Sequence, residues 1–248
     1  MKGVILAGGL GTRLDPLTRV TNKHLLPVYN QPMIHYPIKT LVDAGIKDIL
    51  IVTGGNNAGD FLMLLGNGES FGIKDIHYAY QRGEGGIADA LRLAEHFVGD
   101  DKCVVILGDN LLDHSIKKYV AAFDKQKNGA RILLKKVPDP QRFGVAKLDG
   151  ERIVEIIEKP KHPPSDYAVT GVYMYDYQAF EFIQKLKPSK RGELEITDVN
   201  NMYLRKNQLF YNVLGGHWTD CGTFESLYRA NTIMAEKYLK KLKSRGNL

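Results

Sequence analysis

The first half of the chain alternates short, fully apolar runs with longer stretches in which apolar residues recur every three or four positions. The short runs are rich in β-branched residues and predict buried strands at residues 2–7, 49–53, 76–80 and 103–107. The longer stretches predict helices at residues 33–42 and 87–97. We expect Pro32 near the first turn of the earlier helix, a bend at Pro37 and an end at Gly45. This order of elements predicts a mainly parallel sheet with helices on both faces.

The pattern changes after about Ala130. Strands separated by tight turns are predicted at residues 132–137, 145–148, 153–158 and 168–175. Helices at 177–185 and 196–206, a strand at 209–214 and a last helix at 224–242 follow. No Pro/Ser-rich linker separates the two halves. We therefore predict an α/β protein with a single Rossmann-like domain over residues 1–248. It has a mixed, mainly parallel central sheet, helices on both faces and an α+β elaboration in the second half.

Composition narrows the class of protein. The chain has 248 residues, of which 44% are hydrophobic and 25% charged, an ordinary globular profile. Mean hydropathy is −0.25, and no apolar run is long enough to span a membrane. The two cysteines, Cys103 and Cys221, allow neither a disulfide framework nor a four-cysteine zinc site. The apolar N-terminal run stops at Gly8, too early for a signal peptide, so we expect a cytoplasmic protein with no membrane partner.

The net charge of +6 has two interpretations. A basic face would bind nucleic acid, and a positive cleft would attract small anionic substrates. Much of the excess lies near the C-terminus, at Lys237, Lys240, Lys241, Lys243 and Arg245. At the end of a helix such a cluster is typical of a solvated face that complements the helix dipole.

Polar and glycine-rich segments follow the predicted strands of the first half. These segments are residues 8–13, 54–55, 81–86 and 108–110. Ligands of parallel α/β sheets bind at the carboxyl ends of the strands. The sequence therefore predicts one ligand site where these segments meet.

The segment GGLGTR at residues 8–13 does not fit two familiar phosphate motifs. A Walker loop needs Lys and then Ser/Thr after its last glycine, and here Thr12 and Arg13 follow Gly11. A dinucleotide fingerprint needs a third small residue where Leu14 stands, and an acidic residue where the second strand ends in Thr53. NAD binding is thus disfavoured. Two interpretations stay open: a nest of backbone N–H groups that binds phosphate beside Arg13, or a tight structural turn.

Six motifs in register resemble the sugar nucleotidyltransferase family, and within it the glucose-1-phosphate thymidylyltransferase branch. They are LAGGLGTRLDPLT (6–18), NKHLLPV (22–28), GDN (108–110), EKP (158–160), RGELEITD (191–198) and WTDCGT (218–223). The resemblance implies that dTTP and glucose 1-phosphate give dTDP-glucose and pyrophosphate, a step toward activated sugars such as dTDP-rhamnose. A sugar-phosphate oxygen would attack the α-phosphorus in line, so that catalysis consists of positioning and cations.

The resemblance assigns roles to the first half of the chain, in which residues 1–129 would mainly bind the nucleotide. Arg13 and Lys23 would clamp the triphosphate, and Gln81 with Gly86 would contact the base. Asp109 and Asp220 would jointly hold Mg²⁺, although Asp109 taken alone would be better explained as a helix N-cap. The implied nucleotide-binding set is Leu6, Gly8, Gly9, Gly11, Thr12, Arg13, Lys23, Gln81, Gly86 and Asp109.

Residues 130–248 would mainly bind the sugar. Lys159 and Arg191 would contact the phosphate of glucose 1-phosphate, and Glu158 would accept hydrogen bonds from sugar hydroxyls. The implied sugar-phosphate set is Asn110, Gly144, Glu158, Lys159, Thr170, Gly171 and Arg191. Arg13, Lys23, Asp109, Lys159 and Asp220 would be the catalytic residues. Glu195 and Asp198 either contact substrate or cap the following helix.

The chain departs from the family in two places. The usual Pro-x-Pro between the base-contacting residues is replaced by RGEG at 82–85, which puts base selectivity in question. The sequence also ends soon after the last predicted helix, where several relatives build a regulatory site at a subunit interface. Homo-oligomerisation, as a dimer or tetramer, is expected from the resemblance alone.

Three alternatives remain. The first is the same reaction with UTP, CTP or another hexose 1-phosphate. The second is a non-catalytic regulator that binds nucleotide sugars, which would be expected to lack some of the five catalytic residues. The third is a nucleic-acid binder, which would need aromatic and basic residues interleaved on one strand face. The aromatic residues here are spread along the chain, so we expect no nucleic-acid partner.

Overall fold

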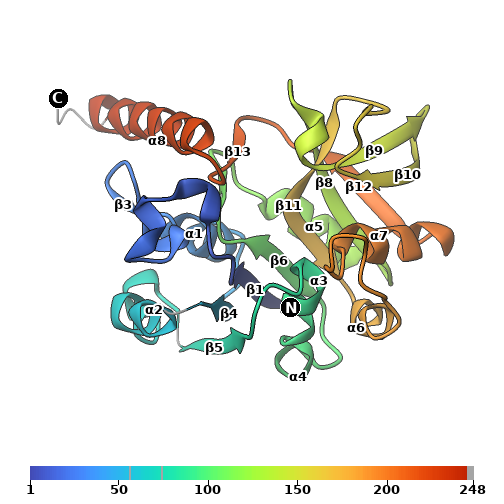
Figure 1. The fold of residues 1–248 in the computed structure, drawn as a ribbon, viewed down its shortest axis with the longest axis horizontal. Coiled ribbons are helices and arrows are strands. Elements are labelled where there is room, and N and C mark those ends of the chain that lie inside the picture. Colours follow the sequence, from blue (N-terminus) through green and yellow to red (C-terminus); the bar gives the residue numbers. More distant parts are fainter. Residues whose placement is uncertain (56, 74, 245–248) are drawn as a thin grey trace.

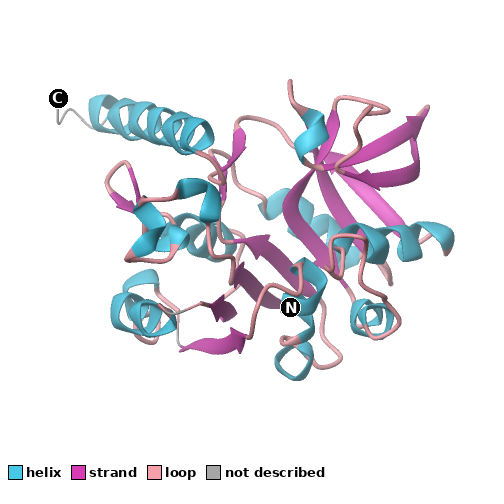
Figure 2. Ribbon diagram, in the orientation of Figure 1, coloured by secondary structure: helices cyan, strands magenta, loops and turns pink. Residues whose placement is uncertain are grey.

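The computed structural model describes residues 1–55, 57–73 and 75–244, so Arg245 of the basic C-terminal cluster lies outside the described residues. Within these ranges the chain folds around a nine-stranded sheet flanked by helices (Figures 1 and 2). Two further ribbons of two strands each lie beside it. This arrangement confirms the predicted α/β fold with a mixed central sheet. No described helix is both long and apolar enough to cross a membrane.

Four parallel strands form the first half of the sheet, in the order β6-β1-β4-β5. They are β1 (Lys2–Ala7), β4 (Asp48–Gly54), β5 (Asp75–Gln81) and β6 (Cys103–Leu107). In β1, Val4 and Leu6 face one hydrophobic cluster and Ile5 and Ala7 face the other. Burial on both faces explains the continuous apolar runs in the sequence.

The long strand β11 (Tyr167–Tyr175) joins this parallel half to an antiparallel half. One edge of β11 pairs with β8 (Ala130–Lys136), and β8 also pairs in parallel with β12 (Leu209–Val213). The C-terminal part of β11 runs antiparallel to β6, and Ala168 pairs with Val145 of β9 (Gly144–Asp149). The hairpin of β9 and β10 (Arg152–Glu158) therefore extends from the start of β11.

Helices cover both faces of the sheet, as predicted. One hydrophobic cluster contains residues of α3 (Ile87–Arg92), α4 (Glu95–Val98), α6 (Gln178–Ile183) and α7 (Ile196–Arg205). The opposite cluster contains residues of α1 (His35–Asp43), α2 (Ala58–Leu65) and α5 (Lys117–Lys125). Side chains of alternating strand positions reach the two clusters in turn, which fixes the strand register.

A third cluster ties the C-terminal helix α8 (Phe224–Ser244) to the N-terminal loops. Leu227, Ala230 and Met234 of this helix pack against Leu14 and Leu26. Beyond Met234 no residue of α8 is buried, and in Figure 1 the helix projects away from the sheet. Lys237, Lys240, Lys241 and Lys243 are exposed, in agreement with the solvated face predicted for them.

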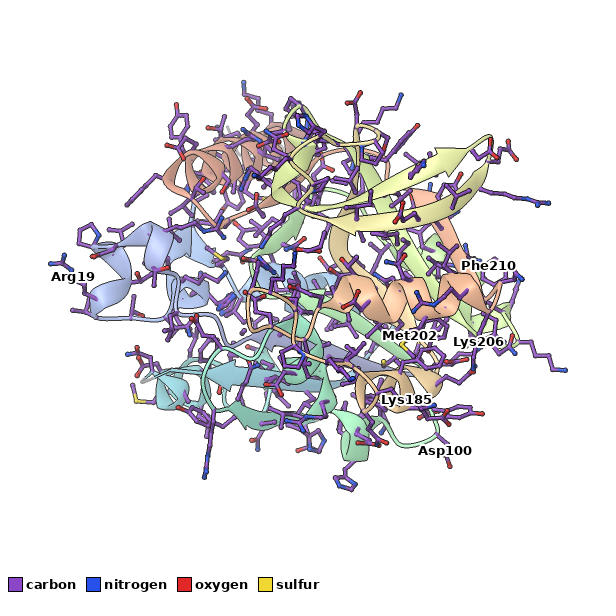
Figure 3. All side chains as sticks on the ribbon, turned by 45° about the vertical axis from the view of Figure 1, so that its right-hand side comes forward. Arg19, Asp100, Lys185, Met202, Lys206 and Phe210 are labelled. Carbon is purple, nitrogen blue, oxygen red and sulfur yellow. The ribbon has the colours of Figure 1, made fainter. Side chains whose placement is uncertain are left out.

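Several short elements complete the fold. The small strands are β2 (Pro27–Val28), β3 (Gln31–Pro32), β7 (Asn110–Leu112) and β13 (Trp218–Asp220). The 3₁₀ turns are η1 (Thr12–Leu14), η2 (Leu17–Arg19), η3 (Lys23–Leu25), η4 (Glu69–Phe71) and η5 (Pro140–Arg142). Figure 3 shows Arg19, in η2, at one end of the molecule and Lys206 and Phe210 at the other.

Two predicted helices differ from the structure. The earlier one was predicted from residue 33 but begins at His35, because Pro32 belongs to β3. Pro37 then lies in the first turn, where a missing N–H costs no intrahelical bond, so the predicted bend has no cause. The helix predicted at 87–97 is two short helices, α3 and α4. The sequence patterns did not predict α2, α5, β7 or β13.

Candidate active site

A cavity of about 380 Å³ opens where the parallel strands end. Most of the residues predicted to bind ligand line it, although they come from segments more than 200 residues apart. Those on the wall are Leu6, Gly8, Gly9, Arg13, Lys23, Gln81, Gly86, Asp109, Asn110, Gly144, Glu158, Lys159, Gly171, Arg191 and Asp220. The predicted convergence of strand ends is therefore present in the structure.

Three predicted residues do not reach the cavity wall: Gly11, Thr12 and Thr170. Thr170 is fully buried, and its hydroxyl donates to the carbonyl of Leu133 at 2.9 Å. It therefore supports the sheet, and this geometry gives no support to its predicted contact with sugar. Gly171, its neighbour, does face the cavity because successive strand residues point to opposite faces.

The glycine-rich loop after β1 is shaped by close contacts. Gly11 adopts φ 69°, a left-handed conformation, and a Cβ there would lie 2.9 Å from the Cβ of Lys23. A Cβ on Gly8 would lie 2.7 Å from Oε1 of Gln81. Gly11 thus lets the loop turn behind Lys23, and Gly8 lets β1 and the end of β5 approach each other. The structural turn is present at Gly11, while Gly8 and Gly9 line the cavity and phosphate binding there stays a prediction.

Lys23 and Asp109 line the cavity and form a largely buried ion pair, with Nζ and Oδ2 2.6 Å apart. Burial acts to raise the pKa of Asp109, but the charges of Lys23 and His24 and hydrogen bonds from Lys23 and Asn110 outweigh it and hold that pKa well below its usual value. His24 packs beside the pair, and burial, together with the charge of Lys23, lowers its pKa to about 3. Asp109 is therefore a carboxylate and His24 a neutral ring at any physiological pH.

Asp220 is brought to Asp109 by the pairing of β13 with β7, in which Asp220 lies opposite Asn110. The amide of Cys221 also donates to the carbonyl of Asp109 at 2.9 Å. Burial and the neighbouring Asp109 carboxylate raise the pKa of Asp220 against the pull of Arg142, Arg13 and Lys23. The negative charges of these two neighbouring carboxylates favour the binding of a cation at this place.

This donor set fits a hard divalent cation. Carboxylate oxygens, with phosphate oxygens and water, are the ligands that Mg²⁺ prefers. Among the described residues, no group of three or more His, Cys, Asp or Glu side chains is placed to hold a metal ion. A cation between Asp109 and Asp220 would therefore take its other ligands from substrate and water.

Arg142 also contacts Asp220, although sequence reasoning did not single it out. One of its NH groups lies 2.7 Å from Asp220 and the other 2.9 Å from Asp139. It lies in η5, one turn before Gly144, and lines the cavity. Its only signal in the sequence is its position two residues before that glycine.

The opposite wall carries an ion-pair network around Arg191. Its guanidinium lies 2.9 Å from Glu193 and from Glu195 and 3.8 Å from Glu158. The Nζ of Lys159 lies 3.9 Å from Glu158, and Thr197 donates a hydrogen bond to Glu158. Glu195 stands at the N-cap of α7 without capping it, because its carboxylate accepts from Ser189 and Arg191 instead.

Asn110 connects Asp109 to β11 and β13. Its Oδ1 accepts from the amide of Gly171 at 2.9 Å and from the indole of Trp218 at 2.7 Å, while its Nδ2 donates to Asp109. A Cβ on Gly171 would lie 2.6 Å from Oδ1 of Asn110, so this position requires glycine. Asn110 thus orients the carboxylate of Asp109. Tyr173, Trp218 and Thr197 line the cavity as well, and the sequence gave no reason to separate them from core residues.

Comparisons with known proteins agree with this geometry. Residues 2–237 match the nucleotidyl transferase family. The chain is 48% identical over 238 residues, which is 94% of this chain and 82% of the relative, to the glucose-1-phosphate thymidylyltransferase of Neisseria meningitidis. A Bacillus anthracis protein assigned as a glucose-1-phosphate thymidylyltransferase, solved with a sucrose, is 55% identical with a TM-score of 0.90 and 94% of each chain covered.

More distant structures share the fold. A UDP-glucose pyrophosphorylase solved with UDP-glucose is 25% identical, with a TM-score of 0.82 over 95% of this chain and 98% of that one. The resemblance found in the sequence motifs therefore extends to the three-dimensional arrangement of nearly the whole chain.

Proposed function

The chain belongs to the nucleotidyl transferase family and is an enzyme of that class, and we propose that it joins dTTP to glucose 1-phosphate, with dTDP-glucose and pyrophosphate as products. The observation that carries the proposal is the division of the cavity into two charged walls. One wall holds the Lys23–Asp109 pair beside Asp220, and the other holds Lys159 and Arg191 around Glu158. Two phosphorylated substrates can thus meet in one cavity of about 380 Å³.

On the first wall, residues 1–129 would bind mainly the nucleotide. Backbone at Gly8 and Gly9, on the cavity wall, would contact the triphosphate, with Arg13 and Lys23 as its cationic clamps. Lys23 is bonded to Asp109, so phosphate binding would exchange one anionic partner of Lys23 for another. Gln81 would present its carboxamide to the base near Gly86.

Asp109 and Asp220 would hold Mg²⁺. When bound, the cation would neutralise charge on the phosphate oxygens. Arg142 would stay beside Asp220 and keep that carboxylate oriented.

On the second wall, residues 130–248 would bind mainly the sugar phosphate. Lys159 follows β10 with φ 43°, and its amide donates to the carbonyl of Phe143, which fixes the direction of its side chain. Lys159 and Arg191 would hold the phosphate, and Glu158 would accept hydrogen bonds from sugar hydroxyls. Gly144 leaves room there, since a Cβ would lie 3.1 Å from Oγ1 of Thr197. The phosphate oxygen held in this way would attack the α-phosphorus in line with the departing pyrophosphate.

A pyrophosphate-release assay tests this proposal. We would measure kcat/KM for dTTP, UTP and dCTP against glucose, galactose and mannose 1-phosphates, with Mg²⁺ and with EDTA. The expected result is the highest efficiency for dTTP with glucose 1-phosphate, none with EDTA, and appreciable use of UTP. Highest efficiency with UTP would favour the alternative suggested by the UDP-glucose pyrophosphorylase fold, and no release from any pair would overturn the proposal.

Asp100→Asn is a matched control for the Asp109 and Asp220 variants, because Asp100 is exposed at the surface (Figure 3) and precedes β6, whereas Asp109 follows the other end of that strand. The cytoplasmic location and the homodimer or homotetramer implied by the resemblance remain predictions. Size-exclusion chromatography with light scattering tests the assembly.

A further inference from the structure

The carboxamide of Gln81 is held by a residue outside all six sequence motifs. Nε2 of Gln81 lies 2.9 Å from Oδ2 of Asp89 and 3.3 Å from the carbonyl oxygen of Gly86. Gln81 is 6% exposed, so water does not compete strongly for these groups. Asp89 is fixed in turn, because its other oxygen accepts from Arg92 at 2.8 Å.

The local sequence explains why Asp89 lies within hydrogen-bonding distance of Gln81. Gly86, with φ 94°, is the N-cap of α3, and Asp89 lies in the first turn, where the helix dipole favours an acidic side chain. A Cβ on Gly85 would lie 2.5 Å from Oδ2 of Asp89. The glycine in the RGEG segment therefore leaves the space that Asp89 occupies beside Gln81.

Asp89 fixes which end of the carboxamide is the donor. An ionised carboxylate only accepts hydrogen bonds, and so does the carbonyl of Gly86. If the amide of Gln81 were flipped, its oxygen would face two acceptors, and both hydrogen bonds would become repulsive contacts. Nε2 therefore stays toward α3, and Oε1 stays toward Gly8.

The fixed orientation of the Gln81 carboxamide determines which bases the site can recognise. Thymine and uracil present an N3–H donor beside an O4 acceptor, whereas cytosine presents an N3 acceptor beside an exocyclic amine. Because Asp89 and the carbonyl of Gly86 take both N–H groups of Nε2, Oε1 is the group that the carboxamide offers to the base. Oε1 accepts from the N3–H of thymine or uracil, but it would face the lone pair at N3 of cytosine. We infer that Asp89 is a positioning residue that makes the site select bases with an N3–H group and reject cytosine, by locking the carboxamide of Gln81.

The inference rests on the proposed function in one respect, namely that Gln81 faces the base. Arg92 and Gly85 contribute only through Asp89. Asn at position 89 offers both a donor and an acceptor, so it would allow either orientation of Gln81.

The test compares dUTP with dCTP, which differ only at the edge that Gln81 would contact. Equilibrium binding of both nucleotides is measured by calorimetry with Mg²⁺ present, and kcat/KM is measured in parallel. In Asp89→Asn the dUTP:dCTP preference should fall by about tenfold or more, while the KM for glucose 1-phosphate and the dTTP:dUTP ratio stay unchanged. Arg92→Gln, which leaves the bond between Asp89 and Gln81, should keep the wild-type preference.

Three outcomes would overturn the inference. The first is a wild-type protein that binds dUTP and dCTP equally, and the second is an Asp89→Asn variant with the wild-type preference. The third is a parallel loss for both nucleotides, since a merely structural role of Asp89 would weaken them together. If the wild type binds dUTP selectively but releases no pyrophosphate, the proposed reaction fails while the calorimetric comparison still decides the role of Asp89.

Discussion

The two walls of the cavity present groups for binding anions in different ways. On the wall formed after β1, β5 and β6, glycines bring the backbone close, and a largely buried ion pair supplies charge beside the exposed Arg13. There the side chains of Lys23 and Asp109 are only 13% and 14% exposed. On the wall formed by β10 and residues 189–197, the charges lie on side chains in a wetter network, with Arg191 38% exposed.

This difference predicts unequal costs of disruption. Removing one partner of a buried pair leaves an uncompensated charge, whereas an exposed pair is screened by water and contributes little. Substitutions on the first wall should therefore change catalysis and folding together. Substitutions on the second wall should change substrate binding with little effect on stability.

The largest effect is expected at the carboxylates. Asp220→Asn should lower turnover by about 10³-fold or more, because a cation between the two carboxylates would supply several kcal/mol of charge stabilisation. Asp109→Asn should do the same and also lower the melting temperature, since it leaves Lys23 without its partner. The double variant should be little worse than either single one, because the two residues act as a unit.

Steady-state pyrophosphate release and thermal unfolding, with Asp100→Asn as control, check these values. Near-normal activity of either single variant under limiting Mg²⁺ would contradict a role as ligand.

A smaller effect is expected from Lys159→Met, which keeps the length of the side chain and removes its charge. The KM for glucose 1-phosphate should rise and kcat should fall, with kcat/KM lower by about 10²-fold and the melting temperature unchanged. Binding of dTTP, measured by calorimetry, should stay near the wild-type value. Lys161→Met, two residues along the same loop and exposed, is the matched control. Loss of dTTP affinity instead would show that Lys159 binds the nucleotide and not the sugar phosphate.

Gln81→Glu should cost about tenfold or more in kcat/KM for dTTP, because a carboxylate would replace the neutral carboxamide beside the base. The structure adds a second reason, since the new carboxylate would stand against Asp89 at the present 2.9 Å contact. Comparing dTTP, UTP and dCTP on wild type and variant measures this. Unchanged efficiency with dTTP would show that Gln81 does not contact the base.

The smallest effect concerns His24, whose pKa burial and the Lys23 charge lower to about 3. An unfolded histidine titrates near pH 6.5, so below that pH the unfolded chain binds one more proton than the folded chain. The free energy of unfolding should therefore fall by roughly 1.4 kcal/mol per pH unit as the pH drops from about 6.5 toward 3. Above pH 6.5 this contribution to stability is fully present.

Urea unfolding at pH 7.5, 6 and 5 measures this slope. His24→Asn should reduce it by about one proton, and His162→Asn, which removes an exposed histidine, is the matched control. A wild-type slope in the His24 variant would count against the buried neutral ring.

The two walls also differ in how far the sequence predicts them. The strands of the parallel half follow from apolar runs, and the glycine-rich loop marks their carboxyl ends. Helix α2 was missed because Leu62, Met63 and Leu64 form an exposed apolar run without helical period. Helix α5 was missed because only Tyr119, Val120 and Phe123 are buried in nine residues.

Contacts between segments distant in sequence were not predictable. The pairing of Arg142 with Asp220 depends on where β13 meets η5. The choice between Thr170 and Gly171 depends on strand register, because a shift of one residue exchanges the faces. The bond from Asp89 to Gln81 depends on how closely α3 approaches the end of β5.

The position of β11 has a consequence for synthesis of the protein. Until residues 167–175 leave the ribosome, β6 has no neighbour on one side and presents unpaired backbone groups at an open edge. The parallel half can collapse earlier, but Asp220 joins Asp109 only when β13 is made, after β11 and α7. Nascent chains that stop before β11 would therefore be inactive and prone to associate through the open edge of β6. Chaperones would prevent most aggregation at this stage of synthesis.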